Sequence, residues 1–347
     1  MKLFQVRAAD VSRVRVPLKR PFVTALGSKT ATENVRIRVR LGGGAEGRGE
    51  ASSSVVQAHL SPARLEATLS RLAAAARGQD ARRWRAMAGE AFARCGEATP
   101  AAAALEAALL DALCRQWGLP LWRLLGGAQD TLETDVTLSA WPAPGAAIAA
   151  REAVRDGFRT LKIKVGTGPA ADWERVRAVA AGRPSPKIIL DGNQKLSPKG
   201  ALGLVRRCLD AGIKVELLEQ PLDREDLDGM RRLTKACPVP VAADESARSP
   251  REALAVLASG AARVLNVKVA KTGLSASLEI VAIARAAGAE LMIGCMQETS
   301  LGLSAGVHLA CGTGAFRWVD LDSDVLLDEP RAEGSYVRRG PRVTAAS

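Results

Sequence analysis

Three carboxylates, Asp191, Glu219 and Asp244, each stand at or just after the end of a short apolar, β-branched run (KIILD, VELLE, VPVAAD). Carboxylate oxygens are hard donors, and three of them at neighbouring strand ends suit Mg²⁺, with water or substrate oxygens completing its shell. The alternative for each residue taken alone is a salt bridge with a nearby lysine. Burying so many charges at one place requires that they pair or bind a metal.

Lysines flank these carboxylates along the chain. Lys162 and Lys164 alternate on one run and share a face, while Lys268 and Lys271 follow a later run. Two lysines on opposite sides of a bound carbon acid could remove a proton from one face and return one to the other. A base must then have a pKa near ~7–8 rather than ~10.4, a shift worth ~3–4 kcal/mol, and Lys162 supplies a like charge that pushes Lys164 in that direction.

The elements that position these residues recur with a regular period. Strand-like runs begin near residues 134, 160, 187, 215, 239, 264, 290 and 316, so successive starts lie 24 to 28 residues apart, and Ala/Leu/Arg-rich helical stretches fill the gaps. Eight strand–helix units predict an α/β fold, a (β/α)₈ TIM-type barrel over residues 129–322. The carboxyl ends of its strands would form one shared mouth.

The region before the barrel has a different character. Alternating strands and a Gly-rich turn occupy residues 1–55, and helices are predicted over 61–125. We expect residues 1–128 to form an α+β capping domain. The C-terminal segment, 323–347, contains the strand-like SYVRRGPRV and is expected to return to this domain and to its sheet.

Composition narrows the class of protein. The 347 residues carry a net charge of +12, but the arginines are spread over helical stretches and aromatics are 3%, which argues against nucleic-acid binding. Six cysteines without CxxC spacing favour a reducing compartment. The N-terminus lacks the apolar stretch of a signal peptide and no apolar run is long enough for a membrane span, so we expect a cytoplasmic enzyme. A homo-oligomer is possible.

One pattern suggests a different chemistry. GLSAG (302–306) fits the GxSxG of a hydrolase, and His308 follows it. A nucleophile elbow needs its serine in the sharp turn directly after a strand, whereas Ser304 is expected inside a helix. We therefore do not predict a hydrolase.

The chain resembles the muconate-lactonizing enzyme subgroup of the enolase superfamily and, within it, the dipeptide epimerases of the L-Ala-D/L-Glu type. The resemblance covers nearly the whole chain. It is carried by PFVTAL (21–26), ENV (33–35), GEA (49–51), GLPLWRLLGG (118–127), TLKIKVG (160–166), LDGNQ (190–194), EQP (219–221), ADES (243–246), NVKVAK (266–271), GCMQETSLG (294–302) and DLD (320–322).

The resemblance implies a role for each matching residue. Lys164 and Lys268 would be the two acid/base groups of a 1,1-proton transfer at the α-carbon of the dipeptide's C-terminal residue, through a metal-stabilised enediolate. Lys162 would tune Lys164 and contact the substrate carboxylate. The remaining roles are Mg²⁺ binding by Asp191, Glu219 and Asp244, binding of the α-ammonium group by Asp320 and Asp322, and lining of the substrate by Thr137, Cys295 and Met296.

Departures from the family pattern leave the preferred dipeptide side chains open. Gly27 stands where relatives specific for an acidic residue carry arginine, and Lys29 is nearby. Lys195 stands where the family usually has glycine. KTGL (271–274) has Gly273 and Leu274 in place of the family's common glycine pair. Acidic, hydrophobic and cationic side chains all stay possible. The alternatives are an o-succinylbenzoate synthase-like lyase or an N-acylamino acid racemase, for which an ammonium clamp has no use, and a non-enzymatic polyanion-binding protein.

Overall fold

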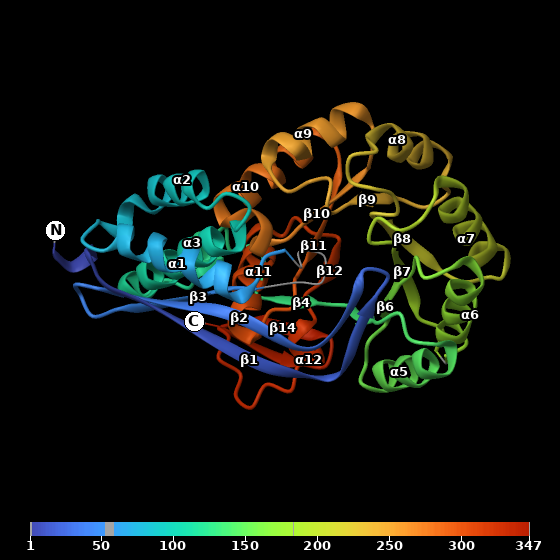
Figure 1. Ribbon diagram of the computed structural model, residues 1–347, viewed down its shortest axis with the longest axis horizontal. Helices are drawn as coiled ribbons and strands as arrows, with labels where there is room; N and C mark the ends of the chain where they lie inside the picture. Colours follow the sequence, from blue (N-terminus) through green and yellow to red (C-terminus); the bar gives the residue numbers. More distant parts are fainter. Residues whose placement is uncertain (1, 53–58, 183, 347) are drawn as a thin grey trace.

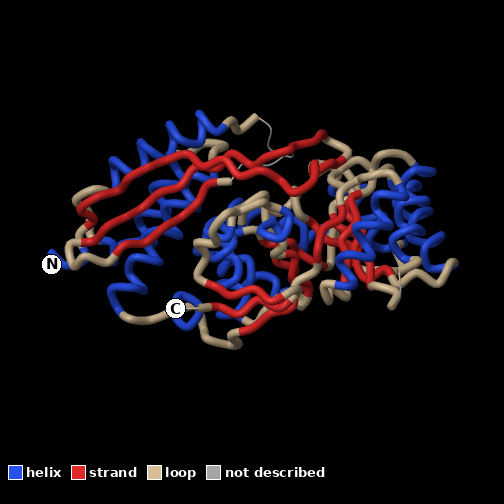
Figure 2. The backbone as a smooth tube through the Cα atoms, turned by 90° about the horizontal axis from the view of Figure 1, so that it is seen from below, coloured by secondary structure: helices blue, strands red, loops and turns tan. Residues whose placement is uncertain are grey.

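The N-terminal region is an antiparallel sheet covered by helices. The computed structural model describes residues 2–52, 59–182 and 184–346. The sheet order is β1 (Val6–Thr24), β2 (Gly27–Leu41) and β3 (Glu46–Ala51), and Figure 2 shows its long strands running along one side of the molecule toward the barrel. In β2, Val35, Ile37, Val39 and Leu41 are buried while Arg38 and Arg40 between them are exposed, because side chains alternate along a strand.

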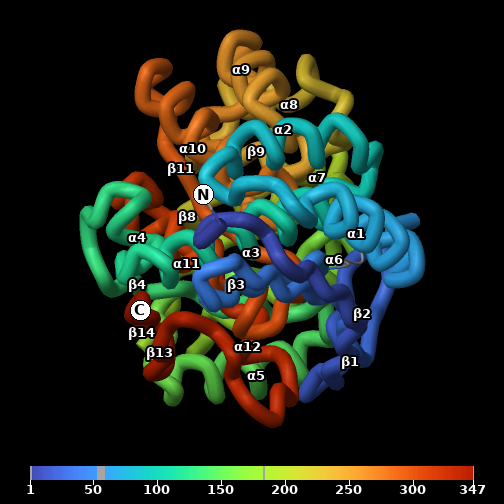
Figure 3. Tube along the Cα trace, turned by 90° about the vertical axis from the view of Figure 1, so that its left-hand side faces the viewer, coloured from blue at the N-terminus to red at the C-terminus, as the bar shows by residue number. Residues whose placement is uncertain are grey.

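The buried face of this sheet packs against helices rich in leucine and alanine. They are α1 (Pro62–Ala76), α2 (Trp84–Arg94) and α3 (Thr99–Trp117), followed by α4 (Leu121–Leu124), with short 3₁₀ turns at Lys2–Phe4 and Ala81–Arg83. Close packing of β3 on α3 requires glycine, since a Cβ at Gly49 would lie 2.0 Å from the carbonyl oxygen of Ala104. These elements stand in front of the barrel in Figure 3.

Eight parallel strands form the predicted barrel sheet, and their spatial order is their sequence order. The strands are β5 (Val136–Leu138), β6 (Thr160–Lys164), β7 (Lys187–Asp191), β8 (Val215–Glu219), β9 (Val241–Ala243), β10 (Val264–Val267), β11 (Glu290–Gly294) and β12 (Trp318–Asp320). The helices are α5 (Ala143–Arg155), α6 (Pro169–Ala180), α7 (Pro198–Asp210), α8 (Leu227–Ala236), α9 (Pro250–Ser259), α10 (Val269–Ala287), α11 (Ser300–Thr313) and α12 (Ser323–Leu326). The predicted fold class is confirmed.

The seam between the first and last barrel strands is held mainly by side chains. One backbone hydrogen bond joins Asp135 N–H to the Val319 carbonyl at 2.9 Å. The Thr134 hydroxyl accepts the Leu321 N–H at 2.8 Å, and the Asp322 carboxylate accepts the Thr137 N–H at 2.5 Å. Side-chain oxygens thus take positions that strand carbonyls hold in a regular ladder.

The C-terminal segment has the predicted strand character but a different partner. Its strands β13 (Tyr336–Arg339) and β14 (Arg342–Ala345) form a three-stranded sheet with β4 (Thr131–Glu133), not with β1–β3 as expected. The physical reason is that Val343 packs into the barrel core. The segment still reaches the capping region, because Glu333 makes ion pairs with Arg36 and Arg48.

A buried carboxylate ties the capping helices to the barrel. Glu106 of α3 accepts the backbone N–H groups of Leu274 and Ser275, at 2.7 and 2.9 Å, where α10 resumes after a kink at Gly273. Gly273 has φ of 73°, and a Cβ there would lie 2.2 Å from a Glu106 oxygen. The glycine in KTGL therefore serves the contact between the two regions.

Among the described residues, no helix combines the length and apolar character that a membrane span needs. Ser304 lies inside α11, as expected, so it is not on a nucleophile elbow. Its hydroxyl donates to the Ser300 carbonyl at 2.9 Å. His308, on the same helix, accepts the Trp122 N–H and contacts Ser335 through its other ring nitrogen.

We expect His308 to make stability dependent on acid. Burial lowers the pKa of this histidine from 6.5 to about 4. Between these pH values the unfolded chain binds a proton on His308 and the folded chain does not. The contribution of His308 to the free energy of unfolding should fall as the pH drops from about 6.5 to about 4, by up to ~3 kcal/mol. Urea unfolding of wild type and of His308→Gln across this range measures it as the difference between the two proteins, which should change with pH. The control is His59→Gln, at the exposed and only other histidine, whose difference from wild type should stay constant.

Candidate functional site

Strand register brings the predicted acid/base and metal residues to one level of the barrel. Lys164 on β6 is paired with Asp191 on β7, and Asp191 is paired with Glu219 on β8. Glu219 pairs with Ala242 on β9, and Asp244 comes two residues later and so faces the same way. The backbone is sharply turned here, since Asn193, directly after β7, has a positive φ of 38°. Four predicted residues therefore meet at the carboxyl ends of adjacent strands.

Lys162 is the centre of the charged interior. Its side chain is almost fully buried, and its Nζ lies 3.1 Å from Asp191, 2.8 Å from Glu219 and 2.7 Å from Asp320. Burial by itself would lower the pKa of Lys162. Attraction by the three carboxylates outweighs it and raises the pKa well above its ordinary value, so this lysine stays charged.

The other lysines lie at the rim on either side of the carboxylates. Lys164 Nζ is 2.6 Å from Asp191 and lies over the ring of Phe22, which comes from β1 of the capping region. Across the carboxylates, Lys268 and Lys271 lie 2.7 and 2.5 Å from Asp244. Burial lowers and Asp244 raises the pKa of Lys268, and the net change is upward, opposite to the shift that sequence analysis expects of a base.

The three carboxylates are buried side by side at the ends of neighbouring strands. Asp191, Glu219 and Asp244 are each at most 2% exposed. Burial, followed by repulsion from Asp191 and Asp244, raises the pKa of Glu219 to about 7. Its Oε2 makes an ion pair with Lys162 at 2.8 Å but has no hydrogen bond of regular geometry among the described residues. The mutual repulsion of three buried carboxylates is what a hard divalent cation would relieve, so the donor set fits one.

A second acidic group faces the first across Lys162. Asp322 accepts the Thr137 N–H, while Asp320 accepts the Thr137 hydroxyl at 3.2 Å and the Lys162 ammonium. Cys295 Sγ lies 3.6 Å from Asp322. Met296 follows and donates its backbone N–H to Glu298 at 3.0 Å. The structure thus gathers Thr137, Cys295, Asp320 and Asp322 around one point, and places Met296 beside them in the chain.

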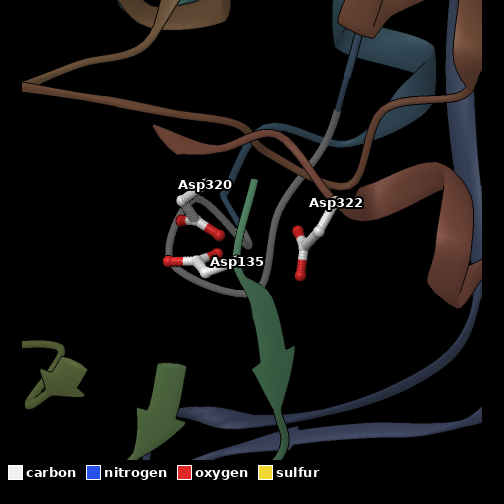
Figure 4. Close-up of side chains that lie close together, drawn as sticks. All are labelled: Asp135, Asp320 and Asp322. Carbon is white, nitrogen blue, oxygen red and sulfur yellow. The ribbon is translucent and has the colours of Figure 1, made fainter. Parts of the chain in front are cut away.

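Asp135 is a member of this group that sequence analysis missed. It precedes β5 and is 3% exposed, and one of its oxygens lies within 4.8 Å of oxygens of Asp320 and Asp322. Figure 4 shows the carboxyl groups of Asp135 and Asp320 facing each other. Alternation gives the signal that could have found it, because Asp135 and Thr137 share one face of the strand.

The capping region reaches this mouth through its first hairpin. The Ala140 N–H donates to the Val23 carbonyl at 2.9 Å, and Figure 1 shows the far end of β1 and β2 beside the barrel. Ala25 in the turn lies 3.5 Å from where a Cβ at Gly166 would be, just after β6. Lys29 is half-buried on β2, and burial lowers its pKa. Lys195, in contrast, is exposed.

Comparison with known proteins identifies the family. Residues 7–126 match the N-terminal domain of mandelate racemase / muconate lactonizing enzymes, and residues 145–346 match the enolase C-terminal domain-like family. The chain therefore belongs to the mandelate racemase/muconate lactonizing enzyme family of the enolase superfamily.

Several of its relatives are named as dipeptide epimerases. The chain is 36% identical over 336 residues to an aromatic dipeptide epimerase from Herpetosiphon aurantiacus (96% of this chain, 94% of the relative). It is also 36% identical over 348 residues to the L-Ala-D/L-Glu epimerase of Bacillus subtilis (99% and 94%). The structure of a dipeptide epimerase from Enterococcus faecalis, complexed with Mg and the dipeptide L-Leu-L-Tyr, superposes with a TM-score of 0.93 at 32% identity (99% and 98%).

We expect removal of the Lys162 charge to destabilise the fold strongly. Lys162→Met keeps most of the side-chain volume but leaves three buried carboxylates without their shared cation, which should cost ~3–5 kcal/mol in the free energy of unfolding. Urea denaturation measures the loss. Lys187→Met removes a lysine that is about half-exposed (side chain 55%) and paired with Glu216, and should cost at most ~1 kcal/mol. Equal losses in the two variants would show that Lys162 is not the central charge.

Proposed function

We propose that the protein is a Mg²⁺-dependent dipeptide epimerase. The observation that carries this proposal is the arrangement of Lys164 on β6 and Lys268 after β10, on either side of the three carboxylate-bearing strands, with a separate pair of aspartates beside them. Relatives named dipeptide epimerases, at 36% identity over nearly the whole chain, support it.

Asp191, Glu219 and Asp244 would hold the metal. When bound, Mg²⁺ supplies positive charge beside the carboxylate of the substrate's C-terminal residue, which makes the α-proton more acidic. Lys162 adds a fixed positive charge on the same side of the site, because its ammonium lies between Asp191, Glu219 and Asp320. A preorganised charge of this kind stabilises the enediolate that forms when the proton leaves.

The two lysines at the rim would exchange protons with the α-carbon. One lysine, uncharged, accepts the α-proton. The electron pair of the broken C–H bond moves into the substrate carboxylate and gives the enediolate. The other lysine, as an ammonium, donates a proton to the opposite face, so a new C–H bond forms with inverted configuration. In the reverse direction the lysines exchange roles, which is how one site interconverts both epimers.

Asp320 and Asp322 would bind the α-ammonium group at the N-terminus of the dipeptide. They are buried, lie two residues apart and are oriented by Thr137. Charge-assisted hydrogen bonds from an ammonium to two fixed carboxylates hold the substrate in register with the lysines. The clamp favours a dipeptide over the acyl acids used by the lyase and racemase alternatives.

Proton exchange in D₂O tests the reaction. With Mg²⁺ present, particular members of an L,L-dipeptide library should gain one deuterium by mass spectrometry, and those members identify the preferred side chains. Lys164→Ala and Lys268→Ala should each lower formation of the inverted, deuterated epimer by at least ~10²-fold, since each removes one of the two acid/base groups that inversion needs. Lys195→Ala, at an exposed lysine near the mouth, should change little. Turnover of an N-succinyl amino acid without any dipeptide exchange would contradict the proposal.

Mg²⁺ should also stabilise the fold. A ligand that binds only the folded chain adds ~2.7 kcal/mol at 100 times its Kd, which thermal unfolding detects as a higher Tm. Glu219→Gln should abolish this shift, because it removes a charged oxygen donor. Asp322→Asn, at a buried carboxylate of the same mouth outside the proposed metal set, should retain it. A shift that survives Glu219→Gln would place the metal elsewhere.

A further inference from the structure

The interior of the barrel mouth holds a second cluster of three acids, and their geometry alone would suit a metal ion. Asp135, Asp320 and Asp322 are each at most 3% exposed, and each offers an oxygen within 4.8 Å of the other two. Figure 4 shows the cluster, which lies at the start of the first barrel strand and the end of the last. It differs from the cluster of Asp191, Glu219 and Asp244 in its hydrogen bonds.

The hydrogen bonds of the three acids are unequal. Asp320 accepts from Lys162 and Thr137 on its two oxygens, and Asp322 accepts from the Thr137 N–H and contacts Cys295. Both oxygens of Asp135 are buried, and among the described residues neither has a donor. A buried carboxylate anion without donors costs several kcal/mol. A carboxylic acid in the same place avoids this cost, because it donates its own proton to the carboxylate that faces it.

The surrounding charges also favour the protonated form of Asp135. Burial, and then the negative charges of Asp320 and Asp322, raise the pKa of Asp135 well above its ordinary value, while Lys162 opposes them. Asp320 differs: despite its burial, direct contact with Lys162 lowers its pKa. The proton therefore belongs on Asp135 and the negative charge on Asp320.

We infer that Asp135 is a neutral carboxylic acid that donates a hydrogen bond to Asp320, and that this sets the cluster to recognise one ammonium group rather than a second divalent cation. Asp320 and Asp322 are then the two anions of the cluster, and Lys162, which is shared with Asp191 and Glu219, offsets part of their charge. An ionised Asp135 would add a third negative charge, as in the cluster proposed to hold Mg²⁺. The identity of the ammonium as the dipeptide's N-terminus rests on the proposed function.

Asp135 acts through Asp320, so it is a positioning residue. Asp135→Asn cannot ionise but keeps an N–H donor toward Asp320, and it should leave kcat/KM for the dipeptide within about threefold of wild type. Asp135→Leu has the same number and branching of side-chain heavy atoms and no donor, and it should raise KM at least ~10-fold with a smaller change in kcat, because a hydrogen bond to a charged group is lost from substrate binding. Equal damage in the two variants would mean that the charge of Asp135 is used, and would overturn the inference.

Two further measurements do not depend on turnover. The infrared difference spectrum of wild type minus Asp135→Asn, at neutral pH, should contain the C=O band of a protonated carboxyl group. A carboxylate band in its place overturns the inference. Mn²⁺ titration followed by electron paramagnetic resonance should give the same number of bound ions in wild type and Asp135→Asn. A site lost in the variant would show that Asp135 is a metal ligand.

These readouts separate two kinds of failure. If wild type exchanges no dipeptide α-proton in D₂O, the proposed function fails, and the infrared band still decides the state of Asp135. If wild type exchanges dipeptides but the infrared band is that of a carboxylate, the proposed function stands and the inference about Asp135 is wrong. Thermal unfolding of both variants shows whether the loss in Asp135→Leu reflects folding.

Discussion

One buried ammonium group holds the functional interior of this barrel together. Lys162 touches two carboxylates of the proposed metal cluster and one of the proposed ammonium clamp, so it balances both at once. Two groups of like charge inside one barrel repel, and burial magnifies that repulsion because little water screens it. A single fixed cation between them offsets this repulsion for both groups.

The rest of the fold serves to keep this interior buried and aligned. Parallel register brings Lys164, Asp191 and Glu219 to the same level, and the first hairpin of the capping region lays Phe22 over Lys164. Glu106 holds the start of the main part of α10, the helix that follows Lys268. Lys164 thus depends on the capping region through the ring of Phe22, and Lys268 depends on it through α10 and Glu106.

Much of the fold and site could be predicted because barrel strands repeat with a regular period and catalytic groups gather at their carboxyl ends. Asp191, Glu219 and Asp320 are each the last residue of a strand, where that rule looks for them. Asp135 precedes its strand, so the same rule passes over it. The partner of the tail strand and the Glu106 contact join residues far apart in the chain, and only packing in three dimensions decides such pairings.

The Asp322 carboxylate accepts a backbone N–H that would otherwise bond to a neighbouring strand, so one group both closes the barrel and faces the proposed substrate. Exchange of this residue for an apolar one, to admit uncharged substrates, would remove that hydrogen bond from the seam in the same step. The ammonium end of the mouth is therefore evolutionarily constrained by the architecture itself. Divergence in substrate preference has an easier route through the hairpin turn around Gly27, which lies outside the barrel sheet.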